Sequence, residues 1–147
     1  KLGVLLTDGA DAKLLDTLKQ AAKKQGAVVE IIAQMIGGVK TSDDAWIEAD
    51  HKIDGGPSVL FDAVVLLMTD AGAELLAKEP AARDFVADAH AHMKFIGYCT
   101  EASPLLRKAG IADELDAGCV VLDNTTAVNN FIRKCAGLRF WDRATAG

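Results

Sequence analysis

Cys99 occupies the position in this sequence where a catalytic nucleophile is expected. The apolar run 95–98 leads directly into Cys99, and a helix is expected over 101–108. This order is typical of a nucleophile elbow, in which a strained turn exposes the side chain and helix amides stabilise a thiolate or oxyanion. A buried cysteine at a strand end is the alternative, because cysteine often packs as a small apolar residue. Both interpretations stay open.

A catalytic cysteine also needs a base, and the three histidines are poorly placed to supply one. No histidine lies in the roughly 25 residues that follow Cys99. His90 and His92 are two positions apart on an expected helix, so their side chains diverge and cannot bind one metal ion together. Near the end of the helix they are expected to offset the helix dipole instead. His51 lies in a polar segment and is expected in a solvated turn. We therefore expect no metal site, and neither hydrolysis nor amide transfer.

Two nucleotide or phosphate chemistries are also disfavoured. The first expected strand is followed by a turn that carries Asp8 and Asp11, where a phosphate loop needs amide donors and little negative charge. A phosphoacceptor domain could use Asp70, but such a domain needs a lysine after the fifth strand, where Asp123 and Asn124 stand instead. We expect no cofactor in this chain.

These residues must be positioned by a parallel sheet. Short apolar runs predict five strands, over 2–6, 27–33, 63–68, 95–98 and 119–122. Helical spacing of apolar residues predicts helices over 14–22, from Pro80 to about 93, over 101–108 and over 125–136. Residues 34–60 contain turn-forming residues and are expected to form an insertion with a small hairpin beside the sheet. The pattern predicts one α/β domain, residues 1–147, with a flavodoxin-like three-layer sandwich.

In such a sheet a ligand binds beyond the carboxyl ends of the strands. The residues expected there are Asp8, Asp11, Thr69, Asp70, Cys99, Asp123 and Asn124. The net charge of −5 disfavours nucleic acid and anionic membranes as partners. Cys119 and Cys135 complete an odd set of three thiols with no zinc-type spacing, so free thiols are expected.

Several stretches of the sequence together resemble a known family. The stretches are Leu5–Ala10, Ile36–Val39, Gly55–Val59, Gly97–Glu101 and Arg139–Arg143. Their order resembles the class I glutamine amidotransferase-like superfamily and, within it, the carboxy-terminal domain of large-subunit haem catalases. The resemblance implies that Lys1 is a boundary within a longer chain, with the haem and its ligating tyrosine in a preceding core. The targeting signals and compartment of that longer chain stay open.

The resemblance also assigns possible site residues. Superfamily enzymes pair an acid after strand 1 with the elbow cysteine and a histidine; these positions fall at Asp11, Cys99 and near Cys119. Because the histidine is absent, the resemblance implies a vestigial site and an accessory domain of the catalase. Its implied partners are the catalase core, sister subunits and, as for some superfamily members, unfolded client proteins. A thiol enzyme or peroxide sensor built on Cys99 is the alternative.

Overall fold

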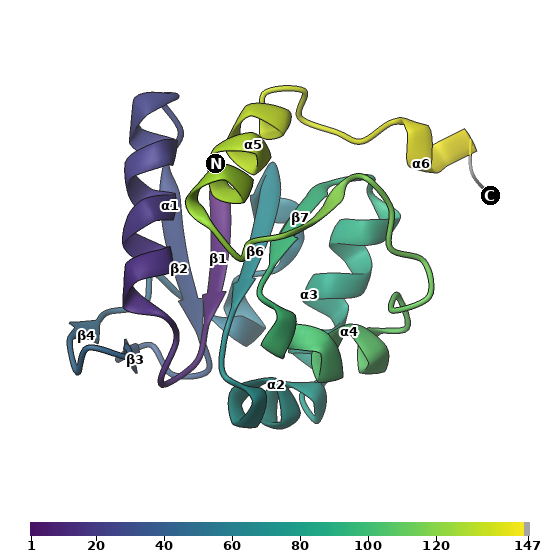
Figure 1. Ribbon diagram of the computed structural model, residues 1–147. Coiled ribbons are helices and arrows are strands. Elements are labelled where there is room, and N and C mark those ends of the chain that lie inside the picture. The colour runs from purple at the N-terminus through teal and green to yellow at the C-terminus, as the bar shows by residue number, and fades with distance from the viewer. Residues whose placement is uncertain (146–147) are drawn as a thin grey trace.

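A six-stranded parallel sheet forms the centre of the molecule (Figure 1). The computed structural model describes residues 1–145. The strand order is β5-β2-β1-β6-β7-β8, and every neighbouring pair is parallel. The bounds are β1 Leu2–Leu6, β2 Val29–Ala33, β5 His51–Lys52, β6 Ala63–Leu67, β7 Phe95–Tyr98 and β8 Cys119–Val121. All residues of β1, β6 and β7 are buried, as expected for strands covered on both faces.

Helices cover both faces of the sheet and complete the three layers. Helix α1 (Ala12–Lys24) packs beside α5 (Thr125–Cys135) on one face. The other face carries α2 (Asp70–Ala77), α3 (Pro80–Ala91) and α4 (Ser103–Ala109), which contact one another (Figure 1). The flavodoxin-like sandwich predicted from the sequence is confirmed, and no helix of the described residues is both long and apolar enough to cross a membrane.

The insertion differs from the expectation in one respect. It contains the predicted antiparallel hairpin, β3 (Val39–Lys40) with β4 (Trp46–Ile47), but its next residues form β5 and extend the main sheet beside β2. His51 is therefore part of a strand, and the predicted solvated turn is wrong. Its Nε2 lies 2.7 Å from Glu30 Oε1, and its ring meets Phe61 edge-on at 5.7 Å.

Two helices were not expected. Helix α2 precedes the predicted helix at Pro80, and the short helix α6 (Asp142–Thr145) follows α5, which was expected to be the last helix. Three 3-10 helices, Ile53–Gly55, Ser58–Leu60 and Thr100–Ala102, complete the fold. The segment after α5 is tied down by the backbone bond from Phe140 N to Met93 O, and the Phe140 ring packs edge-on against Phe95.

Candidate functional site

The carboxyl ends of β1, β6, β7 and β8 border a cavity of about 630 Å³. Five of the residues expected there from the sequence line it, namely Asp11, Thr69, Asp70, Cys99 and Asp123. Gly9, Leu14, Ser42, Leu67, Met68, Thr100, Glu101 and Leu122 complete the lining. The structure therefore brings the two candidate catalytic residues, Asp11 and Cys99, to the walls of one cavity.

Cys99 follows β7 directly but lacks the backbone strain of an elbow. Its φ of −82° and ψ of 155° are ordinary extended values, so the expected strained turn is wrong. The residue is 8% exposed. Its Sγ donates a hydrogen bond to Met68 O at 3.3 Å and accepts one from Met68 N at 3.4 Å, so the backbone of the residue after β6 holds the thiol in place.

The surroundings of Cys99 favour the protonated thiol. Burial is the largest influence and raises the pKa of Cys99, the hydrogen bond with the Met68 backbone opposes it, and the negative charge of Glu101 raises the pKa further. Asp11, Asp70 and Asp123 add carboxylates to the cavity walls. Since the thiolate is the reactive form, this environment makes Cys99 a poor nucleophile.

Asp11 has a structural task of its own. It is the N-cap of α1, and its Oδ1 accepts a hydrogen bond from Leu14 N at 3.0 Å. Within the described part of the chain it forms no hydrogen bond with Cys99. The pair therefore shares a cavity without the direct contact that an acid and a nucleophile would need.

The histidines lie away from this cavity, as the sequence suggested. None of the three lines its described walls. His90 lies in the last turn of α3, as expected, but its ring is buried and its Nε2 donates to Glu114 O at 3.0 Å. His92 is the exposed C-cap residue of the same helix. No described histidine is placed to act as a base on Cys99.

The remaining strand-end residues mainly hold the fold together. Asp8 Oδ1 accepts from Lys40 N at 3.0 Å and ties the β1 end to the hairpin. Thr69 caps α2 by accepting from Gly72 N, and Asn124 caps α5 by accepting from Ala127 N. These bonds account for polar residues that the sequence alone left available for chemistry.

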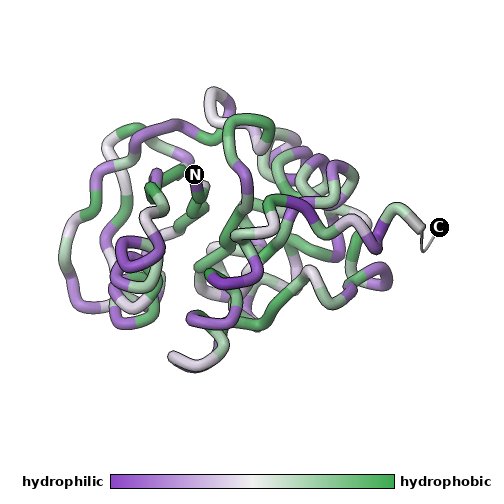
Figure 2. Tube along the Cα trace, turned by 90° about the horizontal axis from the view of Figure 1, so that it is seen from above, coloured by the Kyte–Doolittle hydropathy of each residue, from purple (hydrophilic) through white to green (hydrophobic). Residues whose placement is uncertain are grey.

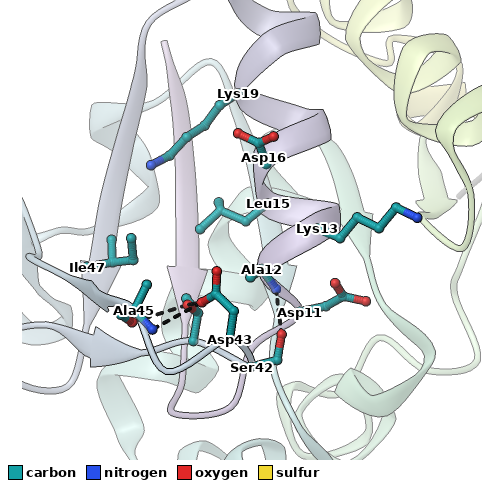
Figure 3. Close-up of a pocket in the computed structure, with 11 residues that line it drawn as sticks. Asp11, Ala12, Lys13, Leu15, Asp16, Lys19, Ser42, Asp43, Ala45 and Ile47 are labelled. Carbon is teal, nitrogen blue, oxygen red and sulfur yellow. Dashed lines mark hydrogen bonds between the residues drawn. The ribbon is translucent and has the colours of Figure 1, made fainter.

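A second hollow, of about 460 Å³, lies between α1 and the hairpin (Figure 3). Ser42 Oγ accepts from Ala12 N at 2.9 Å, and Asp43 accepts from Thr41 Oγ1 at 2.6 Å and from Ala45 N. The Thr41 hydrogen bond is the main reason why the pKa of Asp43 is lowered. The Ser42 bond joins the hairpin to the start of α1, whereas the Asp43 bonds stay within the hairpin turn. The polar groups that line this hollow converge on no common point (Figure 3).

One cluster at the opposite edge of the sheet was missed by the sequence analysis. His90, Asp116 and Cys119 present ligand-type atoms within 4.8 Å of one another. The Arg143 guanidinium contacts the side chains of Asp116 and Cys119. The only local signal was the Asp116–Cys119 spacing of three residues, because the other members come from distant segments. All three cysteines are free, as predicted.

Comparison with known proteins places the sequence among catalase domains. Residues 1–145 match the family described as the C-terminal domain found in long catalases. The chain is 49% identical over 143 residues to Catalase C of Rhizobium meliloti, covering 97% of this chain and 20% of that protein. It is 33% identical over 148 residues to Catalase-2 of Bacillus subtilis, covering 97% of this chain and 21% of that protein. The chain thus spans about one fifth of these relatives.

Solved structures share the fold at low sequence identity. A ThiJ/PfpI domain protein from Brachyspira murdochii superposes with a TM-score of 0.76 at 14% identity, covering 93% of this chain and 94% of that one. Oxidized DJ-1 from Toxoplasma gondii gives a TM-score of 0.71 at 15% identity, covering 99% and 95%. At these identities the similarity concerns the fold alone.

Proposed function

Because the chain belongs to the family of C-terminal domains found in long catalases, we propose that it is a non-catalytic accessory domain of a haem catalase. The family match over residues 1–145 carries this proposal. Relatives about five times as long imply that peroxide decomposition takes place in a part of the protein outside this chain. The task of this domain is then to stabilise the assembled enzyme.

The cavity at the strand ends supports a non-catalytic role. Its cysteine is buried, has a thiol pKa raised by that burial and is bonded to backbone, and its aspartate caps a helix. A third catalytic partner is missing from the described lining. A fold can be shared without its chemistry, and this domain has the superfamily fold with little of the reactive machinery.

Haem does not fit the described residues. The larger cavity is lined by Asp11, Asp70, Glu101 and Asp123, which suit neither an apolar macrocycle nor its propionates. Tyr98, the single tyrosine of the chain, is buried in β7, and burial raises the pKa of its phenol. We therefore assign haem binding to the core of the longer protein.

Exposed apolar side chains near the first residue support contact with that core or with sister subunits. Val28, Val59, Leu60 and Leu138 are all exposed. Backbone bonds link Val28 O to Leu2 N and Lys1 O to Asp62 N, and Leu138 lines a groove with Lys1. Figure 2 shows this end of the molecule from above, with the N-terminus labelled. Exposed apolar patches commonly mark protein interfaces.

Substitutions in the long catalase test this interface. Leu60→Asp should weaken subunit association and shorten the half-life of activity on heating, because it places a charge in an apolar contact. Leu75→Asp is the matched control, since Leu75 is also exposed but lies on α2 at the opposite edge. Equal half-lives for the two variants would contradict the interface.

A second candidate function is binding of unfolded proteins. Met35, Ile36 and Trp46 are exposed apolar residues around the hairpin, and the Trp46 ring lies beside Gly37. If this surface binds clients, the protein should reduce heat-induced aggregation of an unrelated protein, and Trp46→Ser should reduce the effect. No protection at several-fold molar excess would exclude this function.

A further inference from the structure

The side chains of His90, Asp116 and Cys119 converge at the edge of the sheet opposite the larger cavity. His90 Nε2 is 3.9 Å from Asp116 Oδ2, and the ligand-type atoms of all three lie within 4.8 Å of one another. The residues come from the end of α3, the loop before β8 and the first position of β8. They include the nitrogen, oxygen and sulfur donors that bind zinc in proteins.

Local hydrogen bonds hold this arrangement in place. Cys119 N donates to Asp116 O at 3.0 Å, and Gly118 N donates to Asp116 Oδ1 at 2.9 Å, so a tight turn fixes Asp116 relative to Cys119. His90 is fixed to the same loop through Glu114 O. Asp116 and Cys119 are therefore organised before any ligand arrives, and His90 is held nearby but must first release Glu114 O.

The positively charged guanidinium of Arg143 already occupies this cluster. Arg143 Nε donates to Asp116 Oδ2 at 2.6 Å, and Nη2 donates to Asp116 Oδ1 at 3.0 Å and lies 3.6 Å from Cys119 Sγ. Nη1 donates to the carbonyl oxygens of His90 and Lys94. The guanidinium is thus surrounded by acceptors, and it is the main reason why the pKa of Asp116 is lowered.

We propose that His90, Asp116 and Cys119 form a site for a thiophilic divalent cation such as Zn²⁺, which binds by displacing the guanidinium of Arg143. Tetrahedral zinc needs donor atoms roughly 3.5 Å apart, so the side chains move by about 1 Å or less. An adjoining hollow of about 500 Å³, lined by Glu114 and Asp116, gives the ion access and room for Glu114 or water as a fourth ligand.

Binding rearranges two protons. The Cys119 thiol loses its proton to solvent, and the S–Zn bond replaces S–H. The neutral His90 ring carries its remaining proton on Nδ1, so that the Nε2 lone pair faces the ion and its bond to Glu114 O is given up. With the Asp116 and Cys119 anions, the site neutralises the double charge of the cation.

The proposal links metal binding to the C-terminal segment. Arg143 lies on α6, and its contacts with Asp116, His90 and Lys94 fasten that helix to the body of the domain. The ion and the guanidinium both use the Asp116 carboxylate and the Cys119 sulfur, so zinc binding should remove the Asp116 ion pair and loosen α6, which then keeps only the bonds to the His90 and Lys94 carbonyls from this side chain. The metal-free and metal-bound states then present different surfaces at this edge.

Cobalt titration of the purified protein tests the site, because a cobalt–thiolate bond gives a charge-transfer band in the near ultraviolet. The unaltered protein and Cys135→Ser should show the band, and zinc should abolish it by competition. Cys119→Ser should lack the band. Arg143→Met should bind at least about tenfold more tightly, because the competing cation is gone. Absence of the band from the unaltered protein, or its persistence in Cys119→Ser, would overturn the proposal.

Limited proteolysis gives an independent readout on the unaltered protein, with Cys119→Ser as its control. Zinc should accelerate cleavage within residues 137–145 of the unaltered protein and leave the rate unchanged in Cys119→Ser. Equal acceleration in both proteins would overturn the link between the metal and α6.

Discussion

Arg143 and Asp116 form a two-bond ion pair, with Nε–Oδ2 at 2.6 Å and Nη2–Oδ1 at 3.0 Å. The arginine side chain is 8% exposed and that of the aspartate 24%. Such parallel bonds between guanidinium and carboxylate are directional and stronger than bonds between neutral groups. The pair fastens the last described helix across the N-terminal ends of β7 and β8.

Arg143→Met, studied with a chelator present, should lower the free energy of unfolding by roughly 1–3 kcal/mol, because a charged hydrogen-bond network is lost. Urea denaturation measures this change. Arg133→Met is the matched control: Arg133 is an exposed arginine that contacts Asn130, and its loss should cost less than about 0.5 kcal/mol. A similar small loss for Arg143→Met would show that the pair does not fasten α6.

Cys99 should react slowly with alkylating reagents at pH 8, at least about tenfold more slowly than a free thiol of ordinary pKa. Burial and the raised pKa of its thiol both reduce the amount of accessible thiolate. Mass spectrometry of protein treated with iodoacetamide measures the rate, and urea-unfolded protein provides the control in which all three cysteines react. If folded Cys99 reacts faster than a free thiol, the result would contradict this prediction and support the alternative of a thiol enzyme.

The parallel sheet was largely predictable, because strands buried on both faces appear in a sequence as uninterrupted apolar runs. The runs predicted β1, β2, β6, β7 and β8 to within two residues at each end. Strand β5 has no such signal: its two residues are polar, and it exists because the chain pairs with Ile32 and Ala33. Helix α2 is short and contains Gly72, which weakened its helical pattern.

The candidate site was predictable in position but not in chemistry. A strand end followed by a helix places Cys99 at the edge of the sheet, and topology brings Asp11 to the same cavity. The burial of the thiol and its bonds to Met68 depend on the neighbouring strand, which local sequence does not describe. The cluster around Asp116 could not be predicted from local sequence, because His90 lies 26 residues before Asp116 and Arg143 lies 27 residues after it.

Gly38→Ala should destabilise the hairpin by about 2 kcal/mol or more. The φ of Gly38 is 98°, and an added Cβ would lie 1.8 Å from Ile47 O, which is backbone and cannot rotate away. Gly37→Ala is the control, since the nearest atom to its Cβ would be 3.9 Å away. Urea unfolding followed by the fluorescence of the two tryptophans, one of them Trp46 in the hairpin, measures both. Equal stability of the two variants would contradict the described hairpin geometry.

Acid should weaken the edge of the sheet at Glu30. The His51 hydrogen bond is the main reason why the pKa of Glu30 is lowered, with a further contribution from Lys1. The unfolded carboxyl therefore binds its proton at higher pH than the folded one, so this stabilisation is complete above pH about 4.5 and is lost as pH falls through the lowered value. Glu30→Gln should reduce the acid sensitivity of the thermal midpoint. An unchanged pH profile in that variant would argue against the pair.

Alkali should destabilise the protein partly through Cys135. Burial raises the pKa of this thiol to about 12. An unfolded thiol ionises near pH 8.5, so the folded state binds more protons in between, and stability falls as pH rises through roughly 9 to 11. Cys135→Ala should flatten this decline in urea-unfolding experiments. A decline as steep as that of the unaltered protein would place its cause in other groups.

Removal of residues 1–147 from the long catalase that the proposed function implies tests the accessory role most directly. The truncated and complete enzymes are compared for peroxide decomposition at low temperature and for the half-life of activity at elevated temperature. The accessory role predicts equal initial turnover per haem and a half-life shortened several-fold, with faster dissociation of subunits. Loss of turnover in an enzyme that keeps its haem and its assembly, or an unchanged half-life, would contradict it.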